Sequence, residues 1–181
     1  MKYFKKISGE RIYLSPVNLE DIEQYTQWIN DPEISDRLGT SAAMYSLESE
    51  RKILESMAKE GYNFAIILKD SDRLLGNCSL FDINNLRRTA VCGLFIGDKS
   101  ERGKGYGSEA LRLLLGYGFG TLNLNNVMLN VFEFNKNALA CYEKVGFKKI
   151  GERRQAYFVH GCYYNDIYMD ILAEDFYNAD K

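Results

Sequence analysis

The chain has 181 residues, 46% hydrophobic and 27% charged, which is the composition of a globular protein long enough to bury a core without disulfides or metals. Its 23 Lys and Arg residues and 25 Asp and Glu residues give a formal net charge of −2, which argues against nucleic acid or an anionic membrane as a partner. The four cysteines are widely spaced, form no Cys-x-x-Cys pair and accompany a single histidine, which argues against a metal site. No apolar run follows the basic start or reaches about 20 residues, which argues against a secretory signal and a membrane span, so we expect a cytoplasmic protein.

The first third of the chain predicts one strand and two helices. Residues 11–15 alternate in polarity before a proline, as a short strand does. Asn18 is the expected N-cap of a helix that ends at 30–32, because the residue before Pro32 is disfavoured in the α region. A loop should follow, and then a helix over about 46–59 with Ser46 as its N-cap.

The rest of the chain predicts a meander of strands followed by alternating helices and strands. The meander strands are expected at 62–69, 74–81 and 89–96. The later elements are a helix at 108–119, a strand at 127–132, a helix at 137–144, and strands at 155–159 and 162–171 around a turn at His160-Gly161. No repeat or linker interrupts this order, so we predict a single α+β domain over 1–181, with a mixed, mostly antiparallel sheet of about seven strands and helices on both faces.

A glycine-rich segment between the third meander strand and the next helix carries the strongest functional signal. Gly103, Gly105 and Gly107 alternate there, which allows a sharp turn and a close approach of the backbone to a ligand. The free N–H groups of the first helical turn favour a phosphate or diphosphate, and Arg102 and Lys104 add positive charge. A tight turn without a ligand would use the same glycines, but the two cations favour anion binding.

The segment differs from two common nucleotide-binding motifs. It contains no Gly-Lys-Ser/Thr, which excludes a Walker-type loop. Gly105-x-Gly107-x-x-Ala110 satisfies the loose dinucleotide fingerprint, which also requires an acidic residue about twenty positions later. Residues 127–129 are apolar at that point, and an antiparallel meander is atypical of dinucleotide-binding sheets. Because only the glycine spacing fits, a nicotinamide dinucleotide enzyme is a rival hypothesis and not the preferred one.

Several segments resemble one known family. Residues 102–107, Arg-Gly-Lys-Gly-Tyr-Gly, resemble the Gln/Arg-x-x-Gly-x-Gly/Ala signature of the GCN5-related N-acetyltransferases (GNAT). Residues 135–147 resemble the Asn-x-x-Ala-x-x-x-Tyr-x-x-x-Gly-Phe block of that family. Residues 160–169 and 30–33 are similar to the RimJ/RimL-like subgroup, which includes ribosomal-protein N-terminal acetyltransferases and is close to spermidine acetyltransferases. The resemblance covers about the whole chain.

The resemblance implies acetyl transfer from acetyl-CoA, as a co-substrate, to a primary amine on a protein or peptide N-terminus, a polyamine or a small molecule. It implies acceptor-side elements at 18–60, an acetyl-CoA core at 89–147 with splayed central strands, and a closing hairpin at 155–171. The implied cofactor-binding residues are Leu94, Phe95, Ile96, Arg102, Gly103, Lys104, Gly105, Tyr106, Gly107, Ser108, Asn135 and Asn137. Tyr142 is the implied catalytic residue, as the acid that protonates the departing thiolate.

The chain departs from the family pattern in the strand before the glycine segment. Many relatives carry a glutamate where this chain has Val91, which cannot accept a proton. Either water or another carboxylate takes the proton, or the amine arrives already neutral. Asp82 and Glu133 are the candidate carboxylates, although an ordinary solvated position at a strand end is the preferred interpretation of both. Cys92 is expected to be a buried thiol, and His160 a turn residue. This departure keeps a non-catalytic CoA-binding or sensing domain as a second hypothesis.

The acceptor is expected to contact the first helix, the loop at 38–45 and the hairpin around His160. Five aromatic residues in these segments are candidate walls of the acceptor site, with ordinary packing as the alternative: Trp28, Tyr45, Tyr157, Tyr163 and Tyr164. Small α/β enzymes of this kind are often dimers, so a homodimer is compatible with the sequence.

Overall fold

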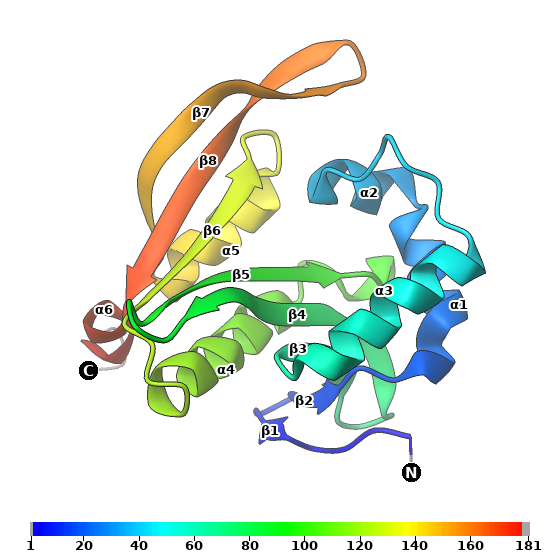
Figure 1. The fold of residues 1–181 in the computed structure, drawn as a ribbon, viewed down its shortest axis with the longest axis horizontal. Coiled ribbons are helices and arrows are strands. Elements are labelled where there is room, and N and C mark those ends of the chain that lie inside the picture. Colours follow the sequence, from blue (N-terminus) through cyan, green and yellow to red (C-terminus); the bar gives the residue numbers. More distant parts are fainter. Residues whose placement is uncertain (1, 179–181) are drawn as a thin grey trace.

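One mixed sheet runs through the molecule, which is described here by a computed structural model over residues 2–178 (Figure 1). The sheet has eight strands in the order β1-β2-β3-β4-β5-β6-β8-β7, and its neighbours are antiparallel except for the parallel pair β5 and β6. The strands are β1 (Ile7–Ser8), β2 (Ile12–Pro16), β3 (Asn63–Leu68), β4 (Arg73–Asn84), β5 (Thr89–Ile96), β6 (Asn126–Phe132), β7 (Lys148–Val159) and β8 (Cys162–Leu172). The domain predicted over 1–181 also includes residues 1 and 179–181, which lie outside the described residues.

The observed sheet confirms the predicted fold class, with one strand more than the expected seven. The additional strand, β1, is only two residues long, which is too short for a periodic pattern. β7 begins at Lys148 rather than at 155, and register shifts along its pairing with β8 interrupt the alternation that would have revealed its first half. His160 (φ 49°) and Gly161 (φ 78°) form the predicted turn between β7 and β8, because positive φ at both central residues suits a two-residue hairpin.

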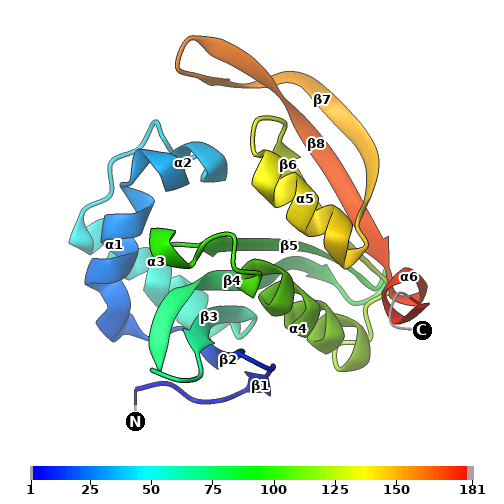
Figure 2. The same cartoon turned by 180° about the vertical axis from the view of Figure 1, so that it is seen from behind.

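Helices cover both faces of the sheet because side chains alternate along its central strands. The helices are α1 (Ile22–Ile29), α2 (Pro32–Leu38), α3 (Leu47–Glu60), α4 (Tyr106–Gly120), α5 (Lys136–Val145) and α6 (Ala173–Asn178). On β3, Phe64 and Ile66 belong to the core beneath α4 and α5, whereas Ala65 and Ile67 belong to the core beneath α1 and α3. Figures 1 and 2 view these two faces from opposite sides. Within residues 2–178, no helix is both long and apolar enough to cross a membrane.

Local signals determine several helix ends as predicted. The Asn18 side chain accepts a hydrogen bond from the Glu20 N–H (2.9 Å) and begins a short 3-10 turn that leads into α1. The Ser46 hydroxyl oxygen accepts from the Ser49 N–H (3.1 Å) and caps α3. Gly146, with φ 114°, ends α5 in the left-handed conformation that glycine adopts without strain.

Helix α2 was not predicted, since the chain after Pro32 was expected to be a loop. The structure places Pro32 at the first helical position. The N–H group of that position forms no hydrogen bond within a helix, so proline loses nothing there, and its fixed φ suits the helix. Asp31 is the N-cap, and its carboxylate accepts from the Glu33 N–H (2.9 Å). The same Asn-Asp-Pro segment therefore ends α1 and begins α2, which carries Glu33 and Asp36 toward the splayed strands.

The parallel strands β5 and β6 separate, as the family resemblance implied. They pair only over 89–91 and 126–128. Beyond this point β5 stays on β4, where Gly93 pairs with Ser79 and Ile96 with Gly76, whereas β6 stays on β8. β6 turns away from β5 toward the long hairpin of β7 and β8 (Figure 1). The facing edges of the two strands are thus left without strand partners over 92–96 and 129–132.

Candidate active site

The glycine segment joins the end of β5 to the start of α4 with its amide groups unpaired. Gly103 and Gly105 have φ values of 76° and 88°, which explains the need for glycine at both positions. The N–H groups of 103–108 donate to no acceptor in the part of the chain that the structure describes. Because these groups precede and open the first turn of α4, they can bind a phosphate group with the support of the helix dipole.

The Arg102 side chain faces the protein, so it anchors the segment. Its Nε donates to the Ile96 carbonyl oxygen (2.9 Å) and its Nη2 to the Gly97 carbonyl oxygen (3.1 Å). Its Nη1 forms an ion pair with Glu33 of α2 (3.1 Å). These contacts hold the loop against the end of β5, and the contribution of this guanidinium to anion binding stays a prediction.

Lys104 and its neighbours form a second set of anchors. Lys104 Nζ lies 3.0 Å from Glu101, which is 7% exposed and also pairs with Arg73 of β4. Hydrogen bonds from Lys104 and Arg73 lower the pKa of the Glu101 carboxyl. On the opposite side, Arg11 donates to the Lys104 carbonyl oxygen (2.9 Å) and its guanidinium lies 4.7 Å from the centre of the Tyr106 ring. These contacts hold the backbone of the loop in place, which is what binding through amides requires.

The start of α4 packs directly on β5 and on α5. A side-chain carbon built on Gly107 would lie 3.4 Å from Leu94 and 3.9 Å from Ile96, so both side chains face α4. Phe95 points to the opposite face, where it contacts Tyr25 and Trp28 edge-on. The Ser108 hydroxyl lies 3.2 Å from Cys141 Sγ of α5. The segment Leu94 to Ile96 therefore lies between the two helical layers, with its backbone edge open toward β6.

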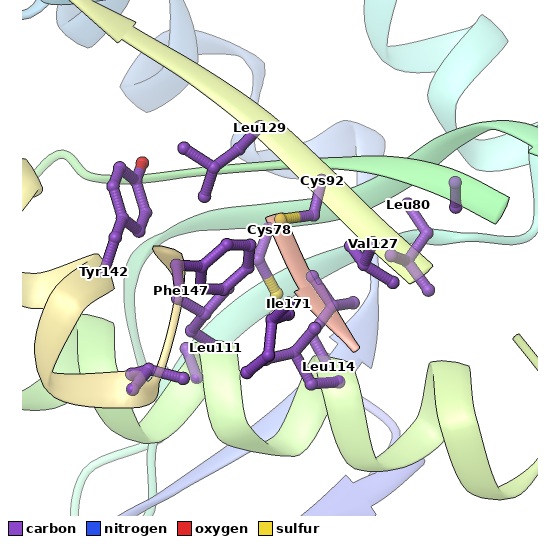
Figure 3. Close-up of a cluster of buried hydrophobic side chains, with 14 of the residues drawn as sticks. Cys78, Leu80, Cys92, Leu111, Leu114, Val127, Leu129, Tyr142, Phe147 and Ile171 are labelled. Atoms are coloured by element: carbon purple, nitrogen blue, oxygen red, sulfur yellow. The ribbon is translucent and has the colours of Figure 1, made fainter. Parts of the chain in front are cut away.

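Tyr142 lies on α5 with its ring in the core and its hydroxyl at the edge of it. The ring is 8% exposed and tilts against Phe147 at 5.9 Å. Figure 3 shows the hydroxyl oxygen pointing away from the apolar cluster. Burial raises the pKa of Tyr142, so the hydroxyl keeps its proton at neutral pH. It has no hydrogen-bond partner among residues 2–178 and is thus free to donate to a ligand.

Asn135 and Asn137 open α5 and line a cavity of about 490 Å³. Asn135 is the N-cap, its carbonyl oxygen accepting from the Ala138 N–H (3.4 Å), so the turn role expected as an alternative is present. Asn137 is exposed in the first turn. The cavity also takes in α2 and the tip of the β7–β8 hairpin, so acceptor-side and cofactor-side predictions meet here. Its lining residues are Pro32, Glu33, Asp36, Arg37, Phe134, Asn135, Lys136, Asn137, Val159, His160 and Tyr164.

The hairpin tip is tied to the N-terminal helices by two polar contacts. His160 Nε2 lies 2.7 Å from the Asp36 carboxylate, and the hydroxyl groups of Ser41 and Tyr157 lie 2.7 Å apart. His160 is thus a turn residue, as expected, and also a contact between the hairpin and α2. Asp36 and His160 both line the 490 Å³ cavity, so the first of these contacts lies in its wall.

The five predicted acceptor-site aromatic residues divide between packing contacts, cavity walls and the exposed surface. Trp28 is buried against Gly97, where an added side-chain carbon would come within 2.1 Å of its ring. Tyr157 stacks on Phe132 at 4.1 Å. Tyr163 is exposed beside Phe158, Tyr164 lines the cavity described above, and Tyr45 lines a second, smaller cavity.

The candidate bases occupy different positions. Val91 is half-buried in the paired part of β5, Asp82 is exposed at an irregularity of β4, and Glu133 accepts from the Asn165 N–H (2.7 Å). Cys92 is buried and its pKa is raised to about 12 by burial, so it remains a thiol, as expected. Residues 2–178 contain no group of three or more His, Cys, Asp or Glu side chains arranged to hold a metal ion.

One acidic residue that the sequence did not single out is buried. Glu50 of α3 is 4% exposed and lines the second cavity, of about 200 Å³, with Tyr45 and Phe95. Acidic residues are common near the start of any helix, so nothing in the local pattern distinguishes Glu50 from Glu48. Its burial depends on α1 and β5, which are distant in sequence.

A parallel strand pair that opens beside an amide-lined glycine loop is the arrangement that the family resemblance implied for an acetyltransferase. The comparison with known proteins leads to the same class: residues 11–148 match the family described as acetyltransferase (GNAT) domain. The chain belongs to the GNAT family and is an acetyltransferase by that membership, and use of acetyl-CoA as co-substrate is general to the family.

Individual relatives extend this similarity over nearly the whole chain. The Bacillus subtilis protein named "Probable N-acetyltransferase YjcK" is 31% identical over 178 residues, covering 93% of this chain and 98% of the relative. The spermidine N(1)-acetyltransferase of Escherichia coli K12 is 35% identical over 101 residues, covering 56% of this chain and 54% of the relative. The crystal structure of spermidine N-acetyltransferase from Vibrio cholerae in complex with CoA and spermine has the same fold, with a TM-score of 0.83 at 23% identity, covering 93% of this chain and 99% of that one.

Proposed function

We propose that this protein transfers the acetyl group of acetyl-CoA to a primary amine, on a small molecule or a peptide N-terminus, by direct attack of the amine on the thioester. The observation that carries the proposal is the row of unpaired amides at 103–108 beside the open edge of β5. The unpaired Tyr142 hydroxyl on the next helix supports it.

The residues present fit coenzyme A. The amides of 103–108 would hold the diphosphate, and the open backbone edge of Leu94 to Ile96 would pair with the pantetheine arm, as strands pair with one another. Asn135 would add its side-chain amide, since its carbonyl oxygen is the atom used in capping α5. Arg102 and Lys104 would act mainly by holding the loop, because both side chains are paired within the protein.

The chemistry requires little from side chains. Acetyl-CoA supplies an acyl group already activated as a thioester, so the protein need not form a covalent intermediate. A backbone N–H on the open edge of β5 would stabilise the negative charge that develops on the acyl oxygen. Tyr142 would donate its proton to the departing sulfur, and burial, which raises the pKa of this residue, keeps that proton in place at neutral pH.

The acceptor is proposed to be a small amine or a peptide N-terminus. The names of the E. coli and V. cholerae relatives refer to spermidine, which supports a small amine. The similarity of 160–169 and 30–33 to the RimJ/RimL-like subgroup supports a peptide N-terminus. The cytoplasmic location and the homodimer remain predictions from the sequence.

Release of free thiol from acetyl-CoA in the presence of a panel of amines and peptides tests the proposal. We expect release that depends on the amine and saturates with it. Binding of acetyl-CoA without turnover across the panel would contradict transfer and favour the non-catalytic CoA-binding domain. Thermal stabilisation by NAD but not by acetyl-CoA would instead favour the dinucleotide enzyme, because a ligand that binds the native state raises its stability.

A further inference from the structure

A small cavity lies on the face of the sheet opposite α4. It has a volume of about 200 Å³ and lies between α1, α3, the connection from α2 to α3, and β5. Its lining residues are Tyr25, Ile29, Thr40, Tyr45, Glu50, Ile53, Met57 and Phe95. Apart from Glu50, none of these side chains carries a charge at neutral pH.

Glu50 differs from the other buried carboxylates in having no partner. Asp21 accepts from the Tyr3 hydroxyl, Glu101 pairs with two cations, and Asp166 accepts from Asn130. The Glu50 carboxyl accepts no hydrogen bond from any residue between 2 and 178, and its Oε2 is fully buried. Burial raises the pKa of this carboxyl. A buried carboxylate without a donor is costly to the folded protein, so its presence requires an explanation.

Tyr25, which also lines the cavity, carries another buried polar group. The Tyr25 hydroxyl is buried without a hydrogen-bond partner. Asn77 lies near this hydroxyl, but its amide donates to the Phe64 carbonyl oxygen (2.9 Å). The Glu50 carboxyl is thus an acceptor-only group without a protein donor, and a ligand with N–H donors would satisfy it.

We propose that this cavity binds a compact aliphatic amine, the acceptor of the transfer proposed above, in its ammonium form, with Glu50 as the residue that recognises the charge. The ammonium passes one proton to the Glu50 carboxylate, and the neutral nitrogen then attacks the thioester carbon while the thiolate leaves. A primary ammonium offers three N–H donors to the Glu50 carboxylate. The rings of Tyr45 and Phe95 line the cavity and would lie beside the cation, and Ile29, Ile53 and Met57 would contact the alkyl chain. The volume admits a short amine or one N-terminal residue, and it is below that of typical sites for larger ligands.

The position of Phe95 connects this cavity with the proposed acetyl-CoA site. Phe95 lies between Leu94 and Ile96, whose side chains face α4, while its own ring forms a wall of the cavity. The strand that would hold the thioester arm by its backbone therefore also bounds the amine cavity. The inference rests on the proposed function, so the two need separate tests.

Thermal denaturation without acetyl-CoA tests the cavity by itself. We expect n-butylamine to raise the melting temperature of the wild-type protein and n-butanol, which lacks the charge, to leave it unchanged. Glu50→Gln should abolish the amine-dependent rise. Glu48→Gln is the matched control, because Glu48 lies on the same helix but is exposed and pairs only with Lys52 (3.1 Å). An unchanged amine effect in Glu50→Gln, or equal stabilisation by n-butanol, would overturn the inference.

Kinetics with n-butylamine and acetyl-CoA provide the second test. Glu50→Gln should raise the KM for the amine about tenfold or more and leave the affinity for acetyl-CoA unchanged, since it removes a charged hydrogen bond to the amine alone. Glu50→Met replaces the side chain if the first variant does not fold, and it should melt higher than wild type. Acetyl transfer with an unchanged amine KM would contradict the cavity and leave the proposed function intact. Amine binding that depends on Glu50, without thiol release, would contradict the transfer and support the cavity.

Discussion

The glycine loop and the Glu50 cavity lie at different parts of β5 and differ in which groups are left unpaired: backbone amides at the loop and a side-chain carboxyl at the cavity. At the loop, the charged side chains are paired within the protein and the unpaired donors are backbone amides. At the cavity, the unpaired group is a side-chain carboxyl, that of Glu50. A site built from amides depends on the conformation of the chain, whereas a site built on one carboxyl depends on that residue. The first suits a co-substrate common to a family, and the second suits an acceptor that differs between its members.

The largest effect is expected from a substitution that changes the path of the loop. Gly105→Val forces a β-branched residue into φ 88°, which such residues avoid, and should abolish measurable binding of acetyl-CoA. Calorimetric titration measures the binding. Gly61→Val is the matched control, because Gly61 has φ 77° at the end of α3 with no atom within 4 Å of an added side-chain carbon. Equal losses in both variants would indicate general destabilisation and contradict the role of the loop.

The next effect concerns turnover rather than binding. Tyr142→Phe removes the proposed acid while keeping the ring against Phe147, and should lower kcat about 100-fold with little change in acetyl-CoA affinity. Steady-state kinetics and titration separate the two quantities. Tyr117→Phe serves as a control, since Tyr117 packs on Phe64 in the same core. Full activity in Tyr142→Phe would remove this residue from the mechanism.

A smaller effect distinguishes the two anchors of the loop, Arg102 with three contacts and Lys104 with one. Arg102→Lys cannot reproduce the three contacts to Ile96, Gly97 and Glu33, and should weaken acetyl-CoA binding about tenfold. Lys104→Met should weaken it only a few-fold, because the exposed Lys104 pairs singly with Glu101. The dissociation constants of the two variants decide the point. A larger loss in Lys104→Met would mean that direct charge, rather than anchoring, dominates at the loop.

The smallest expected effect is a pH dependence of stability at the cavity. Burial raises the pKa of Glu50 in the folded protein above its value in the unfolded chain. The protonated carboxyl therefore contributes its full stability below the unfolded pKa, and this contribution to the free energy of unfolding is lost as pH rises through the folded pKa. Glu50→Met removes this loss, so its advantage in melting temperature over wild type should widen from about pH 5 to about pH 8. Tyr25 and Tyr45 are the other titratable groups lining the cavity, and the test concerns the carboxyl alone. A constant difference across this range would show that the carboxyl does not titrate as proposed.

The sequence by itself determined the features that depend on residues close together in the chain. The alternation of Gly103, Gly105 and Gly107 predicted the loop, the caps at Ser46 and Gly146 predicted helix ends, and the block from Asn135 to Phe147 identified the family. These predictions succeeded because positive φ, capping and helical spacing are local properties.

Tertiary structure decided which side chains are satisfied and which are not. The sequence placed Arg102 beside the anion, but the carbonyl groups at the end of β5 and Glu33 of α2, a helix that was not predicted, turn it toward the protein. Glu50 resembles any acidic residue in a first helical turn until α1 and β5 enclose it. Burial and pairing depend on elements that are distant along the chain, so no local pattern could reveal either role.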